Sequence, residues 1–260
     1  MSAQVSYPTP EHERAAQVIV HEFSGLAQVE AILLVGSCAR GKAGRDSCLD
    51  ITVLLRPDLT PEVRAGLELH WRDVSAAAAF QELGRVGRYS HVDFGFCDGR
   101  FVPHPRSWTD WADEFELEIG NALAYSVPLW DRGDYLRRLK QRWLPYYGDE
   151  VRQTRLAQTA LCCTNNLEHV PLYVERGLYF QAFYRLTHAF QEFMQALFIS
   201  RRTYPIAYDK WIREQVVEIL SLPELYVELT GLFEIQHLES PELAAKAASL
   251  GGLLQHYVQA

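Results

Sequence analysis

The fold of this 260-residue chain is decided by residues 36–41, Gly-Ser-Cys-Ala-Arg-Gly, and by residues 47–53, Ser-Cys-Leu-Asp-Ile-Thr-Val. The apolar run Ala31–Val35 just before the first stretch predicts a strand. A glycine-serine turn that ends a strand and begins a helix presents backbone N–H groups and the positive end of the helix dipole to an anion. We therefore expect Gly36 and Ser37 to bind phosphate.

The second stretch predicts another strand, Leu49–Leu55, which ends before Pro57. Side chains two residues apart on a strand project from the same face. Cys48 and Asp50 are therefore expected to lie side by side. An acid at both positions would provide paired carboxylates, and in this chain one of them is replaced by a thiol.

The two stretches together resemble the nucleotidyltransferase superfamily of the DNA polymerase β type, in particular its aminoglycoside and lincosamide branch with a helical C-terminal domain. The matching residues are Gly36, Ser37, Arg40, Gly41, Ser47 and Asp50. The resemblance implies transfer of a nucleoside monophosphate from a nucleoside triphosphate, ATP in particular, to a hydroxyl of a small molecule. It also implies that Gly36, Ser37, Arg40 and Ser47 bind the nucleotide.

The resemblance further implies that paired aspartates and a third carboxylate hold Mg²⁺ or Mn²⁺ ions. Asp50 is the remaining member of the pair, and Cys48 occupies the other ligand position. Magnesium prefers oxygen ligands, so a thiol replaces a carboxylate poorly. Two compensations are open: Asp46 substitutes as a ligand, or Cys48, Asp50, Asp93 and His91 bind a softer ion such as manganese or zinc.

The third acid is assigned to Asp93, in the alternating segment His91–Phe96 that predicts a strand. His91 shares a face with Asp93 if that strand is regular. Cys97–Arg100 contains an Asp-Gly pair, which favours a hairpin turn, and Phe101-Val102 is expected to return as the next strand. By resemblance, Asp50 and Asp93 are the catalytic carboxylates.

Composition limits the functions that fit the chain. A net charge of −8 with a pI near 5.6 disfavours a nucleic-acid partner and favours a small substrate. A basic patch at Arg40, Lys42 and Arg45 suits a triphosphate, and a solvated loop is equally consistent with these charges. Five cysteines without paired metal-ligand spacing indicate reduced thiols, and no segment indicates a membrane span, so we expect a cytoplasmic protein.

Helical patterns dominate the chain after a boundary expected near Arg132-Gly133. We predict an α/β (α+β) nucleotidyltransferase domain with a mixed β-sheet over residues 1–132, then an all-α helical bundle over residues 133–260. The expected elements, besides those above, are helices at 11–23, from Thr60-Pro61, 108–111 with 114–119, 135–144, 150–168, 179–200, 210–220 and 241–258, and a strand at 122–129.

The helical half supplies acceptor contacts in the proteins that this chain resembles. Candidates for a general base there are Glu168, Glu175, Glu192 and Lys210, although acids on amphipathic helices more often form a solvated face. Aromatic residues in this half leave room for a homodimer. The alternatives to a transferase are a catalytically impaired nucleotide-binding protein and an interaction protein of the toxin–antitoxin kind.

Overall fold

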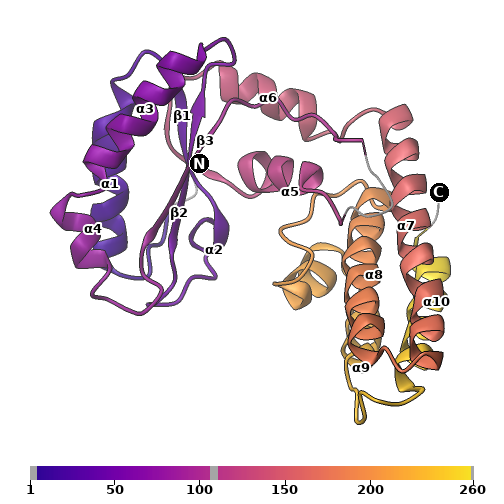
Figure 1. Ribbon diagram of the computed structural model, residues 1–260. Helices are drawn as coiled ribbons and strands as arrows, with labels where there is room; N and C mark the ends of the chain where they lie inside the picture. The colour runs from indigo at the N-terminus through magenta and orange to yellow at the C-terminus, as the bar shows by residue number, and fades with distance from the viewer. Residues whose placement is uncertain (1–4, 106–110, 259–260) are drawn as a thin grey trace. The chain divides into compact units, whose positions relative to one another are not determined.

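The computed structural model describes residues 5–105 and 111–258 (Figure 1). The chain divides into two compact units, each described here by itself. Unit 1 comprises the described parts of Met1–Val102 and Glu118–Pro145, and unit 2 those of Pro103–Leu117 and Tyr146–Ala260. The expected helix at 108–111 lies largely outside the described residues. The domain boundary near Arg132-Gly133 stays a prediction.

Unit 1 is built on a four-stranded mixed sheet in the order β3-β2-β1-β4. β1 pairs antiparallel with β2 and with β4, whereas β2 pairs parallel with β3. The strands are β1 (Val29–Leu34), β2 (Leu49–Leu55), β3 (Val92–Cys97) and β4 (Val127–Asp131). The prediction of a mixed sheet followed by helices is confirmed, and β2 has the expected bounds.

Three helices of unit 1 form a layer that covers one face of the sheet: α1 (Pro10–Ser24), α3 (Pro61–Val74) and α4 (Ala78–Leu83) (Figure 1). Unit 1 also contains α2 (Gly36–Ala39) and α6 (Tyr135–Trp143). Thr60 caps α3 as expected, because its side chain accepts a hydrogen bond from the Val63 amide at 3.4 Å. Phe23 of α1, Trp71 of α3 and Phe94 of β3 pack together beneath this layer.

Alternation along β2 and β3 separates the core from the opposite face of the sheet. Leu49, Ile51 and Val53 of β2 are buried in the core beneath the helices. Phe94 of β3, the register partner of Ile51, packs against the same core. Successive side chains point to opposite faces, so Asp50 and Asp93 project away from this core. A register slip of one residue would place both acids among apolar side chains.

One expected strand is absent, and another begins later than expected. Phe101-Val102 does not return as a strand; Phe101 instead packs edge-on against Trp143 at 5.6 Å between ring centroids. Gly99 does take the expected positive angle, with φ of 72°. The strand expected at 122–129 begins only at Val127, as β4. The residues before it form α5 (Phe115–Ile119) and the π-helix η1 (Gly120–Ala124) instead.

Unit 2 is helical in its described residues. It contains α7 (Asp149–Glu175), α8 (Tyr179–Ser200), η2 (Glu214–Ile219), α9 (Pro223–Leu232) and α10 (Glu242–Tyr257). α7 and α8 form a hairpin joined through Gly177, and α10 packs against both. α7 runs beyond its expected end and through Pro171, whereas the helix expected at 210–220 is mainly the π-helix η2. Pro223, expected as a break, begins α9 because proline suits the first turn of a helix.

A membrane crossing would need a longer and more apolar helix than any found in the described residues.

Candidate functional site: a thiol between two carboxylates

The candidate site lies where β2 and β3 begin, on the face of the sheet away from α1. The parallel register pairs Asp50 with Asp93, so both carboxylates project from the same face on neighbouring strands. Cys48 lies two residues before Asp50, and its thiol projects to the same side. One ligand atom from each of these three residues lies within 4.8 Å of the others. The structure therefore brings together the three residues predicted to hold metal.

The Cys48 thiol donates a hydrogen bond to Asp50 Oδ1 at 3.2 Å. Burial, reinforced by the negative charges of Asp50 and Asp93, raises the pKa of the Cys48 thiol to about 12. The side chain is therefore a neutral thiol at physiological pH when no cation is bound. The proton between sulfur and oxygen occupies the position at which a cation would contact both atoms.

Gly36 fixes the other oxygen of Asp50. Its φ is 64°, a left-handed conformation that favours glycine. A Cβ atom built on Gly36 would lie 2.7 Å from Asp50 Cγ and would overlap Asp50 Oδ2. The Gly36 backbone thus packs directly on the carboxylate. This close approach explains why glycine is needed at the end of β1, where the Gly-Ser turn was predicted from sequence.

His91 extends the cluster along β3. Its Nε2 lies 3.0 Å from Asp93 Oδ1, and both side chains are more than half exposed. The backbone carbonyl of His91 accepts a hydrogen bond from the Leu49 amide at 2.8 Å, which fixes the start of β3 against β2. His91 therefore contacts the carboxylate of Asp93, as the shared face predicts, and it does not belong to the three-residue group itself.

The other predicted nucleotide-binding residues stabilise the turn and loop in this structure. Arg40 Nη1 donates to the Gly36 carbonyl at 2.8 Å, and the Lys42 amide donates to the Ser37 carbonyl at 2.9 Å. Ser47 Oγ accepts from the Gly44 amide at 2.9 Å. Ser37 is nearly buried, at 9% exposure. Their nucleotide contacts stay predictions, and these bonds show how the chain from 36 to 47 holds its shape.

A buried histidine, which the sequence analysis did not single out, anchors this loop. His12 of α1 is fully buried; its Nε2 lies 3.0 Å from the Ser47 carbonyl and its Nδ1 lies 2.9 Å from Thr9 Oγ1. Cys38 reinforces the same region, because its thiol donates to the Cys48 carbonyl at 3.5 Å. Burial raises the pKa of Cys38 to about 11, so this thiol too is neutral. The sequence signal for this anchor was the polar residue His12 on the apolar face of the helix expected at 11–23.

Asp46 is exposed and does not join Cys48, Asp50 and Asp93 in the group that could hold an ion. Its Cα lies 2.8 Å from a Cβ built on Gly87, so the loop packs tightly there. The residues of the predicted basic patch have different surroundings. Arg45 lines a hollow of about 470 Å³, whereas Arg40 donates a hydrogen bond to the Gly36 carbonyl.

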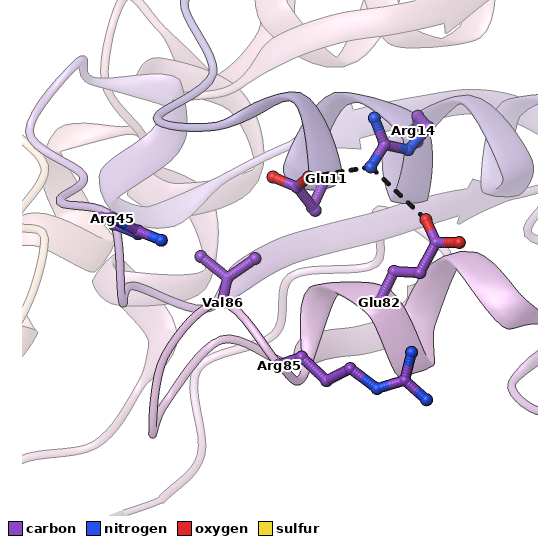
Figure 2. A pocket seen from close by; sticks show the side chains of 6 residues that line it. All are labelled: Glu11, Arg14, Arg45, Glu82, Arg85 and Val86. Carbon is purple, nitrogen blue, oxygen red and sulfur yellow. Dashed lines mark hydrogen bonds and ion pairs between the residues drawn. The ribbon is translucent and has the colours of Figure 1, made fainter.

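Figure 2 shows this hollow, formed by α1, α4 and the residues that follow α4. Arg14 pairs there with Glu11 at 2.9 Å and with Glu82 at 3.4 Å. None of Cys48, Asp50 and Asp93 lines the hollow. Arg45 therefore lines a hollow to which these three residues do not contribute.

In unit 2, the four candidate general bases fall into two groups. Glu168 and Glu175 are exposed on α7, as expected for a solvated helix face, and Lys210 is exposed in the segment before η2. Glu192 is buried at 1% exposure, and its Oε2 accepts a hydrogen bond from Asn166 Nδ2 at 2.8 Å. Arg185 Nη1 in turn donates to Asn166 Oδ1 at 2.6 Å. Glu192 is thus held inside unit 2 by α7.

The three donors of the cluster differ from the all-oxygen set that magnesium prefers. Mg²⁺ requires oxygen ligands in near-octahedral geometry. Here one of three donors is a neutral thiol, and it also hydrogen-bonds to a carboxylate oxygen that a metal would use. Two carboxylates remain for Mg²⁺, from Asp50 and Asp93.

No protein-family model and no curated protein matches the chain. Among solved structures, the chain is similar to a nucleotidyltransferase-like protein from Exiguobacterium sibiricum 255-15, with 16% sequence identity and a TM-score of 0.45. The similarity covers 94% of this chain and 74% of that protein. A likeness at this level leaves the function to be inferred from the residues of the site.

Proposed function

We propose that this chain is a nucleotidyltransferase-type protein that binds a nucleoside triphosphate, ATP in particular, on unit 1. The reaction would transfer the nucleoside monophosphate to a hydroxyl of a small molecule and release pyrophosphate. The observation that supports the proposal best is the pairing of Asp50 with Asp93 in register across β2 and β3, with the Gly36 backbone packed on Asp50.

The chain's own residues have distinct tasks in this proposal. Gly36 and Ser37 bind the phosphates through the turn that follows β1, where backbone N–H groups face an anion. Arg40 and Ser47 hold that turn and the following loop in place through the bonds described above. Asp50 and Asp93 attract the cation that accompanies the triphosphate. Divalent ions supply charge neutralisation in phosphoryl and nucleotidyl transfer when bound.

Cys48 favours a second candidate function, nucleotide binding without turnover. A protein that lost one carboxylate keeps the turn for phosphate but holds the accompanying cation less tightly. Since each 1.36 kcal/mol of transition-state stabilisation changes a rate by about tenfold, losing a ligand that contributes several kcal/mol slows transfer by orders of magnitude. Such a protein would respond to nucleotide without consuming it.

Binding and turnover of ATP and GTP test both candidates. Nucleotide binding is measured by calorimetry and pyrophosphate release by a coupled assay with water as the acceptor hydroxyl, each with Mg²⁺. The variants are wild type, Cys48→Asp and Cys162→Ser, whose thiol lies on α7. We expect wild type to bind nucleotide and Cys48→Asp to release pyrophosphate at least about tenfold faster.

The outcomes separate the candidates. Slow but measurable release by wild type supports the transferase, whereas binding with release only by Cys48→Asp supports the second candidate. If neither protein binds ATP or GTP, both candidates are wrong. Cys162→Ser should behave as wild type in every assay.

A further inference from the structure

We propose that Cys48, Asp50 and Asp93 form a binding site for a divalent ion that accepts sulfur ligands, such as Zn²⁺, Co²⁺ or Cd²⁺, in preference to Mg²⁺. The inference rests on the proposed function in that both assign a cation to the carboxylates of Asp50 and Asp93. It differs because it names the ion by the chemistry of Cys48, and it requires no nucleotide.

The distances fit one ion that contacts all three residues. Cys48 Sγ and Asp50 Oδ1 are 3.2 Å apart, and the three ligand atoms lie within 4.8 Å of one another. Two ligands of a tetrahedral zinc, with bonds of about 2.3 Å to sulfur and about 2.0 Å to oxygen, are about 3.5 Å apart. The Asp93 side chain is 55% exposed, so solvent can reach the third donor.

The backbone holds two of the three donors in place. Cys48 directly precedes β2 and donates a hydrogen bond to Asp50, the second residue of that strand, and the Gly36 backbone packs on the Asp50 carboxylate. The Cys48 carbonyl is also fixed, because it accepts the hydrogen bond from Cys38. The donors are thus arranged before any ion binds, which lowers the cost of ordering them.

His91 is positioned to orient the Asp93 carboxylate as a metal ligand. Its Nε2 is 3.0 Å from Asp93 Oδ1, so it positions the most exposed donor of the set. Carboxylate ligands of metals are commonly hydrogen-bonded in this way, and such partners raise metal affinity. His91 is therefore a positioning residue here, and the remaining coordination positions are left to water.

The donor chemistry selects the ion. A thiolate is a soft ligand that favours zinc and similar metals, whereas magnesium favours oxygen. On binding, the Cys48 thiol gives its proton to solvent, and sulfur forms the bond to the metal in place of the S–H bond. One thiolate and two carboxylates then carry three negative charges beside the two positive charges of the ion.

Cobalt serves as the optical probe, since Co²⁺ bound to a thiolate absorbs in the near ultraviolet by charge transfer. Co²⁺ alone is added to wild type, Cys48→Ser, Asp93→Asn and Cys162→Ser, and Zn²⁺ affinity is measured by displacing the Co²⁺. We expect the thiolate band in wild type and Cys162→Ser. Loss of an outer partner of a metal ligand weakens binding by about 10–100-fold, so loss of the ligand itself in Cys48→Ser should weaken Zn²⁺ binding at least about 100-fold.

Cys48→Asp reverses the preference. It should lose the thiolate band and bind Mg²⁺ or Mn²⁺ more tightly than wild type does, because the third donor becomes a carboxylate. Circular dichroism at each titration confirms that the variants are folded. A thiolate band that is absent from wild type, or retained by Cys48→Ser, overturns the inference.

The metal titration and the nucleotide assays fail independently. A Cys48-dependent cobalt band in a protein that binds no nucleotide supports the inference and contradicts the proposed function. Nucleotide binding by a protein that shows no such band supports the proposed function and contradicts the inference.

Discussion

Each unit of this protein brings two carboxylates together, and the two pairs are held in opposite ways. In unit 2, Arg155 is 4% exposed and binds Glu116 through Nε at 2.6 Å and Asp113 through Nη2 at 2.7 Å. In unit 1, a neutral thiol lies between Asp50 and Asp93. A fixed guanidinium contributes one positive charge to the first pair, whereas the thiol contributes none to the second.

The unit 2 pair is further satisfied by neutral donors. Tyr147 donates to Glu116 Oε1 at 2.6 Å, and Gln195 Nε2 donates to Glu116 Oε2 at 3.0 Å. Burial, together with the charge of Glu116, raises the pKa of Tyr147 far above its usual range. The Glu116 carboxylate is thus paired and hydrogen-bonded inside unit 2. In unit 1, Asp93 is half exposed and accessible to a cation, and four substitutions test this contrast.

Arg155→Met should have the largest effect, because it leaves a buried carboxylate at Glu116 without its cation. Removing one partner of a buried ion pair typically costs about 3–5 kcal/mol. We expect the free energy of unfolding, measured by urea denaturation, to fall by that amount.

The control for Arg155→Met is Arg137→Met, which breaks the exposed pair with Asp134. No measurable change is expected there, since exposed pairs contribute little. Equal effects of the two substitutions would show that the Arg155 pairs do not stabilise unit 2.

Gly36→Ala tests whether contact with the Gly36 backbone holds the Asp50 carboxylate in place. A left-handed conformation costs a residue with a Cβ about 1–2 kcal/mol, and here the added atom also displaces Asp50. The matched control is Gly41→Ala, since Gly41 has φ of 68° and no atom within 4 Å of a built Cβ. We expect Gly36→Ala to destabilise the protein more than Gly41→Ala and to weaken cobalt binding, which Gly41→Ala leaves unchanged. Equal effects would argue against the contact with Asp50.

His188 tests whether burial also sets the response of unit 2 to pH. The ring contacts Trp111 and Tyr184, and burial, reinforced by the charge of Arg185, lowers its pKa to about 4. Between that value and the ordinary 6.5, the unfolded chain binds more protons than the folded one, so stability falls as pH decreases through this range. His188→Asn should flatten the fall in unfolding free energy between pH 6.5 and 4. An unchanged slope would mean that other groups cause it.

Asp93→Asn should have the smallest effect on stability and the clearest effect on cation binding. The Asp93 side chain is 55% exposed, and substitutions at exposed positions usually change stability by less than about 0.5 kcal/mol. Unfolding by urea should match that of wild type while the cobalt affinity falls. A loss of stability comparable to that of Arg155→Met would show that the unit 1 pair is structural too.

The same contrast explains which parts of the structure the sequence could predict. Asp50 and Asp93 lie on short alternating strands, Cys48 directly precedes the first of them, and the two-residue period predicts which face each side chain occupies. Their pairing follows once the two strands are neighbours. Gly36 was predictable as a turn, but its contact with Asp50 depends on the tertiary packing of β1 against β2.

The unit 2 network could not be predicted in this way. Glu116, Arg155 and Gln195 come from three separate segments, and no local spacing links them. The one available signal was the position of Arg155 among the buried residues of α7, next to Leu156. The expected strand at Phe101 failed for a similar reason, since the long-range contact with Trp143 determines where that residue packs.

Anomalous diffraction from crystals of the wild-type protein soaked in Co²⁺ tests the central claim most directly. We predict an anomalous peak bonded to Cys48 Sγ and to carboxylate oxygens of Asp50 and Asp93, which disappears in Cys48→Ser. A peak bound only elsewhere, or the same peak in Cys48→Ser, would contradict the account.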